Sequence, residues 1–182
     1  MRDFVLDRIR RYGYFYNRDG FTLKSGAVSN ELFDLSRCLR FSEGLYALGC
    51  MISPFFESNT KAVLGMGAGG DMLAAAAVTS SNYPNVGWAT IREQPKGRGA
   101  DLGCITGPVE KYDQVVVVED VLTTGESLIE ALRRCFDAEL VVQKVVVLLD
   151  REEFNGYNRV KQFDSRLPIH TLFTRSDVVN WP

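Results

Sequence analysis

The stretch VVVVEDVLTTGESL, Val115 to Leu128, decides the fold that we expect for this chain. Its four consecutive valines have the composition of a strand that is buried on both faces. Two acids, Glu119 and Asp120, stand at the end of this strand, and a Thr-Thr-Gly turn then leads into a segment with helical spacing. A buried strand that passes through a glycine turn into a helix is typical of a parallel α/β sheet.

Strand and helix patterns alternate on both sides of this stretch. Strand composition is found at 61–65, 85–91, 141–150 and 169–173, and helical patterns at 3–12, at 74–78 and for about a dozen residues from Ser42. The segment FTLKSGAVSNELFDLSR, 21–37, predicts two extended pieces around a turn. The alternation predicts one α/β domain whose mostly parallel sheet is covered by helices on both faces.

Length, charge and composition exclude several classes of protein. The chain has 182 residues, of which 46% are hydrophobic and 24% charged, as is ordinary for one globular domain. A net charge of -2 argues against a nucleic-acid surface. No apolar run approaches the roughly 18 residues of a membrane span, so we expect no membrane partner. Residues 1–14 also lack the uninterrupted apolar segment of a signal peptide.

The cysteines and the single histidine limit the chemistry further. The four cysteines stand far apart and form no CxxC pair: Cys38, Cys50, Cys104 and Cys135. We therefore expect isolated thiols, a reducing compartment and a cytoplasmic protein. His170 is the only histidine, so a metal site built on several histidines is excluded, and we assign no metal ligands to the chain.

Three polar or glycine-rich segments each follow a predicted strand. They are GMGAGGD at 65–71, REQPKGRG at 92–99 and EDVLTTGES at 119–127. In open parallel sheets, ligands bind outside the carboxyl ends of the strands. The coincidence of the three segments at such ends favours a binding site more strongly than any one of them.

The segment EDVLTTGES combines groups that favour an anion with two acids that repel one. Backbone N–H groups at the start of the predicted helix and the hydroxyls of Thr123–Ser127 favour an anion, and Gly125 permits close approach. Glu119 and Asp120 repel a phosphate, and the segment has no P-loop lysine. A phosphorylated ribose with a magnesium-bound pyrophosphate satisfies both features, because its hydroxyls donate to carboxylates. An ordinary capped helix after a strand is the alternative.

VVVVEDVLTTGES closely resembles the phosphoribosyl pyrophosphate (PRPP) signature of the type I phosphoribosyltransferases. The resemblance implies that Glu119 and Asp120 hold the ribose hydroxyls. It also implies that the following loop binds the 5'-phosphate through Thr123, Thr124, Gly125, Glu126 and Ser127. Mg²⁺ is then delivered with PRPP, without a dedicated protein cage.

Two further segments resemble the orotate phosphoribosyltransferases within that family. FTLKSGAVSNELFDLSR is similar to their N-terminal segment, which implies that Lys24 contacts the pyrophosphate or the base and that Phe33, beside Leu32, flanks the pyrimidine. LLDREEFNGY is similar to their apolar-Asp-Arg segment, which implies that Arg151 pairs with the orotate carboxylate in the bidentate geometry of a guanidinium. Thr123 is expected to contact orotate as well. The alternatives are a solvated Lys24 on a surface turn and an Arg151 that is only a charged residue after a strand.

IREQPKGRGADLG resembles the lid loop of the orotate enzymes, which reaches into the neighbouring subunit. Arg92 and Lys96 match that loop and are expected, with Glu119 and Asp120, to act in catalysis; Arg98 is expected to bind PRPP. Glu93 stands where the family usually has lysine, and Arg98 where it has histidine. This exchange should weaken catalysis or shift its pH dependence. Taken alone, the segment is a basic, glycine-containing surface loop.

GMGAGGD occupies the place of the family's pyrophosphate loop, although glycine-rich turns occur in many folds. The resemblance implies that the backbone N–H groups of Ala68, Gly69 and Gly70 cradle pyrophosphate. Asp71 offers no benefit to an anion, so we expect its side chain to face away.

The sequence therefore predicts a type I phosphoribosyltransferase fold in a single domain, 1–182. We expect a core at about 41–150 and a small hood from about 1–40 and 151–182. The expected activity is transfer of phosphoribosyl from PRPP to orotate, in a homodimer that shares its lid loops. Two alternatives stay open: a phosphoribosyltransferase for another base, and a PRPP-binding regulator with weak or no turnover. A regulator would bind PRPP without releasing pyrophosphate.

Overall fold

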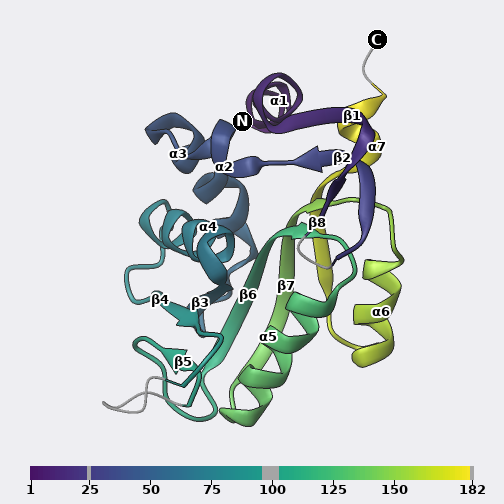
Figure 1. Cartoon of the computed structure of the whole chain (residues 1–182). Helices are drawn as coiled ribbons and strands as arrows, with labels where there is room; N and C mark the ends of the chain where they lie inside the picture. The colour runs from purple at the N-terminus through teal and green to yellow at the C-terminus, as the bar shows by residue number, and fades with distance from the viewer. Residues whose placement is uncertain (24–25, 96–102, 181–182) are drawn as a thin grey trace.

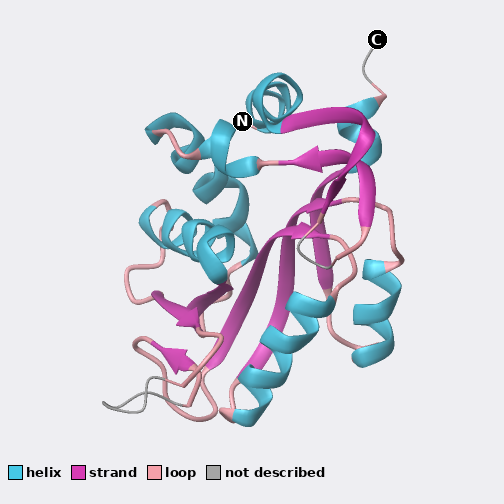
Figure 2. Cartoon of the chain, viewed as in Figure 1, coloured by secondary structure: helices cyan, strands magenta, loops and turns pink. Residues whose placement is uncertain are grey.

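The computed structural model describes residues 1–23, 26–95 and 103–180, and within them the chain forms a central sheet and a separate hairpin (Figures 1 and 2). The central sheet has six strands in the order β5-β4-β3-β6-β7-β8, all parallel except β5, which is antiparallel to β4. The strands are β3 (Thr60–Met66), β4 (Gly87–Ile91), β5 (Ile105–Thr106), β6 (Gln114–Leu122), β7 (Val141–Asp150) and β8 (Ile169–Thr174). The predicted α/β fold with a mostly parallel sheet is confirmed.

Helices cover both faces of this sheet, which explains the run of four valines. Val116 and Val118 pack on one face with α3 (Ser42–Ile52) and α4 (Gly67–Thr79). Val115 and Val117 pack on the other face with α5 (Glu126–Asp137) and α6 (Gly156–Phe163). Because successive side chains of a strand point to opposite faces, a strand between two helical layers must be apolar at every position.

The order of the strands reverses between β3 and β6. From β3 the chain passes through α4 to β4 on one side, and it later returns to place β6 on the other side of β3. The connections α4 and α5 therefore leave neighbouring strands toward opposite faces. Such a switch point opens a crevice at the carboxyl ends of the two strands. The expected crevice lies where GMGAGGD and EDVLTTGES meet.

The hairpin and the terminal helices lie beyond the carboxyl ends of β6 and β7 (Figure 1). The hairpin consists of antiparallel β1 (Tyr14–Thr22) and β2 (Val28–Phe33). Both extended pieces and their turn exist, but the first begins at Tyr14 and not at the predicted Phe21. Around it lie α1 (Arg2–Arg8), η1 (Ile9–Gly13), α2 (Leu35–Leu39) and α7 (Arg175–Val179). Asp177 of α7 accepts from Arg2 of α1 at 3.1 Å, so the two ends of the described chain contact each other.

Three local features differ from the sequence-based expectation. Residues 151–182 were assigned to the hood, but β8 pairs with β7 as the edge strand of the central sheet, and only α7 lies with the hairpin. The glycine-rich segment at 65–71 is no loop, because α4 begins at Gly67. The short elements η2 (Ser53–Phe55), β5 and α6 differ from the sequence-based expectation: η2 and β5 have only three and two residues, and the eight residues of α6 lie in a segment of mixed pattern. Among the described residues, no helix is long and apolar enough to cross a membrane.

Candidate active site

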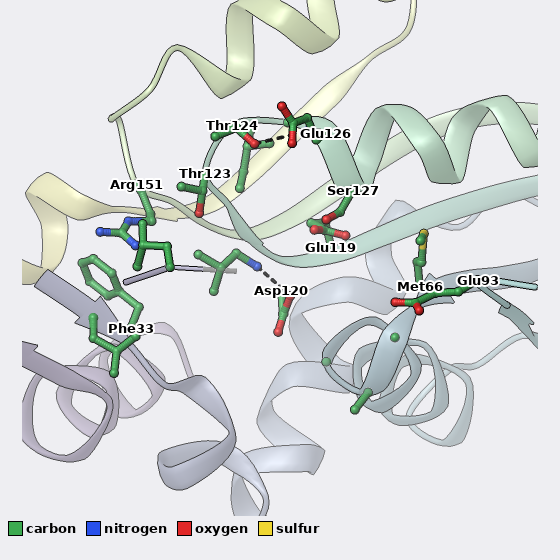
Figure 3. A pocket seen from close by; sticks show the side chains of 18 residues that line it. Phe33, Met66, Glu93, Glu119, Asp120, Thr123, Thr124, Glu126, Ser127 and Arg151 are labelled. Atoms are coloured by element: carbon green, nitrogen blue, oxygen red, sulfur yellow. Dashed lines mark hydrogen bonds between the residues drawn. The ribbon is translucent and has the colours of Figure 1, made fainter. Parts of the chain in front are cut away.

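A cavity of about 440 Å³ lies at the switch point, at the carboxyl ends of β3 and β6. Figure 3 shows Arg151 and Phe33 at one end of the cavity, Met66 and Glu93 at the other, and Asp120 between them. The residues that line it are Leu23, Leu32, Phe33, Met66, Gly67, Ala68, Gly69, Glu93, Glu119, Asp120, Val121, Leu122, Thr123, Thr124, Gly125, Glu126, Ser127 and Arg151.

Two helices begin at the wall of this cavity. Gly125 precedes α5 with φ +78°, and Gly67 opens α4 with φ +68°, a left-handed backbone that favours glycine at both turns. The N-cap residues Met66 and Gly125 make no side-chain hydrogen bond to their helices, and at α5 the Thr124 hydroxyl accepts from the Glu126 N–H at a long 3.5 Å. The first N–H groups of a helix have no partner inside the helix, and they carry the positive end of its dipole. The cavity therefore offers two backbone sites for anions, one at the start of each helix.

The acids at the end of β6 lie between these two anion sites. Glu119 is buried, with 7% exposure, and Asp120 is half-buried. One carboxylate oxygen of Asp120 accepts from the N–H of Val121 at 2.9 Å, which holds the side chain close to its own backbone. Buried carboxylates favour donors such as hydroxyl groups. The arrangement suits a ligand with hydroxyls in its middle and phosphates at its two ends.

Arg151 and Phe33 form the opposite end of the cavity. The guanidinium of Arg151 lies 5.4 Å from the Phe33 ring centroid, and the residue is only 2% exposed. Its Nη2 donates to Ser29 Oγ and to the carbonyl of Glu31, both at 2.9 Å. The hairpin and the end of β7 are thereby joined beside the cavity.

A neighbouring acid already occupies one edge of this guanidinium. Nε and Nη2 of Arg151 donate to one oxygen of Glu153 at 3.1 and 2.8 Å. Among the described residues, Nη1 has no hydrogen-bond partner. Nη1 is the donor that remains for a ligand, so the predicted bidentate pairing with a ligand carboxylate would require Glu153 to give up its bonds to Arg151. The pairing of Glu153 with Arg151 was not predicted, because the conformation of the loop that follows β7 carries no sequence signal.

A second ion pair, between Glu31 and Arg175, also holds the hairpin in place. Both carboxylate oxygens of Glu31 accept from Arg175 at 2.6 and 2.7 Å, and Tyr14 donates to Glu31 at 3.1 Å. Hydrogen bonding from Arg175 holds the pKa of Glu31 below its ordinary value. Strand β2 is therefore fixed at Glu31 through its side chain and its carbonyl.

Most of the predicted site residues that the structure describes line the cavity. They are Phe33, Ala68, Gly69, Glu119, Asp120, Thr123, Thr124, Gly125, Glu126, Ser127 and Arg151. Gly70 does not: it packs against the backbone of Gly65, where a Cβ atom on Gly70 would lie 3.0 Å from the Gly65 Cα. Asp71 is also absent from the lining, and burial raises its pKa against the opposing hydrogen bonds of Thr90 and Trp88. Lys24, Lys96 and Arg98 lie outside the described residues.

Arg92 is described but is not among the lining residues. Its N–H donates to the Cys104 carbonyl at 2.8 Å, and its own carbonyl accepts from Arg134 of α5. Its side chain is exposed beside the cavity-lining Glu93. Residues 92 and 104 are thus joined where the predicted lid begins and ends.

The charge of the lining was not evident from the sequence. Within the described chain, four acids and one arginine line the cavity: Glu93, Glu119, Asp120, Glu126 and Arg151. No group of three or more His, Cys, Asp or Glu side chains among the described residues could hold a metal ion. Met66, Val121 and Leu122 were also missed, because apolar strand ends carry no chemical signal.

Comparison with known proteins extends this picture. No family model matches the chain. The chain is 33% identical over 141 residues to the orotate phosphoribosyltransferase of Nostoc sp., covering 76% of this chain and 68% of that protein. It is 32% identical over 162 residues to that of Aquifex aeolicus, covering 87% and 86%. The solved structure of Mycobacterium tuberculosis H37Rv orotate phosphoribosyltransferase in complex with Fe(III) dicitrate matches with a TM-score of 0.81 and 22% identity over 98% of each chain.

Proposed function

The chain belongs to the orotate phosphoribosyltransferase family, and from this premise we infer that it transfers the phosphoribosyl group of PRPP to orotate, forming orotidine 5'-monophosphate and pyrophosphate. One observation carries the assignment of this reaction to the cavity: the paired acids at the end of β6 lie in the same cavity as the first turn of α5. This juxtaposition supports the recognition of ribose hydroxyls beside a phosphate.

The proposed placement of PRPP follows the three parts of the cavity. The 5'-phosphate binds at residues 123–127, and the ribose hydroxyls donate to Glu119 and Asp120. The pyrophosphate lies against Ala68 and Gly69 in the first turn of α4. Each phosphate group then meets backbone N–H donors, and each hydroxyl meets a carboxylate.

The reaction is a displacement at the anomeric carbon. The bond from this carbon to the pyrophosphate oxygen breaks, and a bond to the ring nitrogen of orotate forms. Positive charge develops on the ribose ring, and the carboxylates of Glu119 and Asp120 stabilise it because they are fixed beside the ring before reaction. Holding both reactants in one cavity lowers the entropic part of the barrier.

We place orotate between Phe33 and the end of β7. The Phe33 ring and Leu32 contact the flat pyrimidine, Nη1 of Arg151 donates to its carboxylate, and Thr123 contacts its polar edge. The fixed position of Arg151 supports this proposal, because a buried guanidinium held by three partners loses little further freedom on binding.

The acidic lining requires cations from elsewhere. We propose that Lys24, Arg92, Lys96 and Arg98 supply them around the pyrophosphate, and that Mg²⁺ arrives with PRPP. The residues present fit such a ligand, because carboxylates at the centre of the cavity are the oxygen donors that magnesium prefers. Bound magnesium would neutralise part of the charge on the leaving pyrophosphate.

We further propose a single domain 1–182, in a homodimer whose segments 92–103 serve the partner's site. The resemblance of this segment to the family's lid supports the dimer. We propose a cytoplasmic location, which the four free thiols at Cys38, Cys50, Cys104 and Cys135 support.

The decisive experiment mixes the protein with magnesium, PRPP and orotate and follows the loss of orotate's ultraviolet absorbance together with pyrophosphate release. PRPP-dependent loss that an Asp120→Asn variant lacks is the expected result. No loss in a protein that still binds PRPP would contradict the assignment to orotate. Pyrophosphate release with another base would then identify a different phosphoribosyltransferase, and none with any base would identify a regulator.

A further inference from the structure

Glu126 places a negative charge in the proposed phosphate site. It stands in the first turn of α5 and lines the cavity next to Thr124, whose hydroxyl accepts from the Glu126 N–H at 3.5 Å (Figure 3). The positive end of the α5 helix dipole stabilises a carboxylate at this position. It opposes a phosphate dianion, because like charges within a few ångströms repel. Phosphate binding at residues 123–127 therefore needs a cation close to Glu126.

Arg159 of α6 is such a cation. Its Nη2 and Nη1 lie 3.4 and 3.5 Å from the same oxygen of Glu126. Arg151, the one described arginine in the lining, is engaged by Glu153. In the described part of the chain, the Glu126 carboxylate has no other ion-pair partner. The described cation that pairs with Glu126 thus comes from outside the predicted motif.

Helix α6 is packed directly on the phosphate loop, which fixes the position of Arg159. A Cβ atom on Gly156 would lie 2.2 Å from the Thr123 carbonyl oxygen. A Cβ atom on Gly125 would lie 2.9 Å from the Gly156 carbonyl and 3.1 Å from Val160 Cγ2. Val160, the residue after Arg159, is fully buried. Two facing glycines therefore bring the backbone of α6 against the loop, and Arg159 stands at the rim.

We propose that Arg159 is a positioning residue for the 5'-phosphate of PRPP. Its guanidinium offsets the charge of Glu126 and holds that carboxylate outward, so that the N–H groups at the start of α5 meet the phosphate. This inference rests on the proposed function of the cavity. It adds a residue of α6 to the phosphate site and assigns Glu126 the role of an opposing charge.

The test measures binding of ribose 5-phosphate and of pyrophosphate separately, by calorimetry at low salt. Arg159→Ala should weaken ribose 5-phosphate binding roughly five- to tenfold, an effect that falls at high salt, because an exposed charge is screened. Pyrophosphate binding should not change. The double variant Glu126→Gln/Arg159→Ala should return ribose 5-phosphate affinity to within about twofold of the wild type, because the charge to be offset has gone. A merely structural role of Arg159 would not be rescued in this way.

Arg133→Ala is the matched control. It removes the same charge from α5, where Arg133 lies 3.9 Å from Glu130 and does not line the cavity. Folding should be intact in the Arg159 variants, since this pair is 40% and 63% exposed and such pairs contribute little stability. Unchanged ribose 5-phosphate affinity in Arg159→Ala, or no rescue in the double variant, overturns the inference. A wild type that binds ribose 5-phosphate but does not turn over PRPP and orotate would instead contradict the proposed function alone.

Discussion

Gly69 abuts the carboxylate of Asp120, and the contact leaves room for no side chain. A Cβ atom on Gly69 would lie 1.8 Å from Asp120 Oδ2 and 2.3 Å from its carboxyl carbon. The first turn of α4 and the end of β6 therefore meet at the point where the proposed pyrophosphate and ribose sites join. Glycine is required here because the Asp120 carboxylate fills the space that a side chain would need.

Gly69→Ala should displace the Asp120 side chain and reduce turnover of PRPP by at least roughly tenfold. Stability should change little, because alanine favours a helix more than glycine does. Steady-state kinetics beside thermal unfolding separate the two effects. Asp120→Ala is the comparison, and the double variant should lose little more than Asp120→Ala alone. Wild-type activity in Gly69→Ala would show that the position of Asp120 does not matter.

Gly156→Ala tests the support of the phosphate loop. The new methyl group would lie 2.2 Å from the Thr123 carbonyl oxygen and must push the loop and α6 apart. We expect the KM for PRPP to rise roughly tenfold, with a loss of about 1–3 kcal/mol in the free energy of unfolding. Asn158→Ala, an exposed change on the same helix, should affect neither quantity. Equal KM values in the two variants would contradict the role of α6.

Arg151→Lys should weaken orotate binding roughly 10- to 100-fold and leave the KM for PRPP within about twofold. An ammonium group cannot reproduce the donors that Arg151 directs to Ser29, Glu31 and Glu153, nor the remaining Nη1. Kinetics with each substrate varied in turn make the comparison. If the KM for orotate and the KM for PRPP rise equally, the substitution disturbs the fold as a whole and Arg151 has no specific role in binding orotate.

Glu31→Gln should change how the free energy of unfolding depends on pH in the acidic range. Arg175 lowers the pKa of folded Glu31 below the ordinary 4.5, so the ion pair stabilises the protein above that pH. This contribution is lost as the pH falls through the lowered pKa. At pH 7 the variant should lose about 1–3 kcal/mol, and below pH 4 its difference from the wild type should shrink. Urea unfolding at both pH values tests this. A constant difference would contradict the lowered pKa.

Cys38 and Cys135 should resist alkylation in the native protein. Burial raises the pKa of the Cys38 thiol to about 11 and that of Cys135 to about 12. At pH 8 only roughly one thousandth of the Cys38 thiol is ionised, and the thiolate is the reactive form. Mass spectrometry after iodoacetamide treatment should find these two unmodified and the half-buried Cys50 and Cys104 modified. Denatured protein, in which all four react, is the control.

The predicted features that the structure confirms depend on local pattern. Four valines between helix-forming segments require a strand with a helix on each face, and this holds wherever the strand lies in the sheet. The role of the acids after Val118 and of the turn at Gly125 could also be predicted. Two adjacent acids at the end of a buried strand contribute nothing to a hydrophobic core, so they indicate a binding site. The Gly65–Gly70 contact was not evident, since a glycine against a ligand and a glycine against backbone look alike in sequence.

Local sequence pattern predicts the principal strands β3, β4, β6, β7 and β8, the helices α3, α4 and α5, the place of the anion site at the start of α5 and the acids beside it. Those features follow from the spacing of neighbouring residues. Only the tertiary structure decided that Glu153 takes one edge of Arg151, that Arg175 holds Glu31, and that Arg159 faces Glu126. The pairs Arg175–Glu31 and Arg159–Glu126 join side chains from elements that meet only when the chain has folded, whereas Arg151 and Glu153 are neighbours whose loop conformation brings them together. A charged side chain can pair with any opposite charge near it. The sequence therefore shows which charges are present, and the folded structure determines which of them lie close enough to pair.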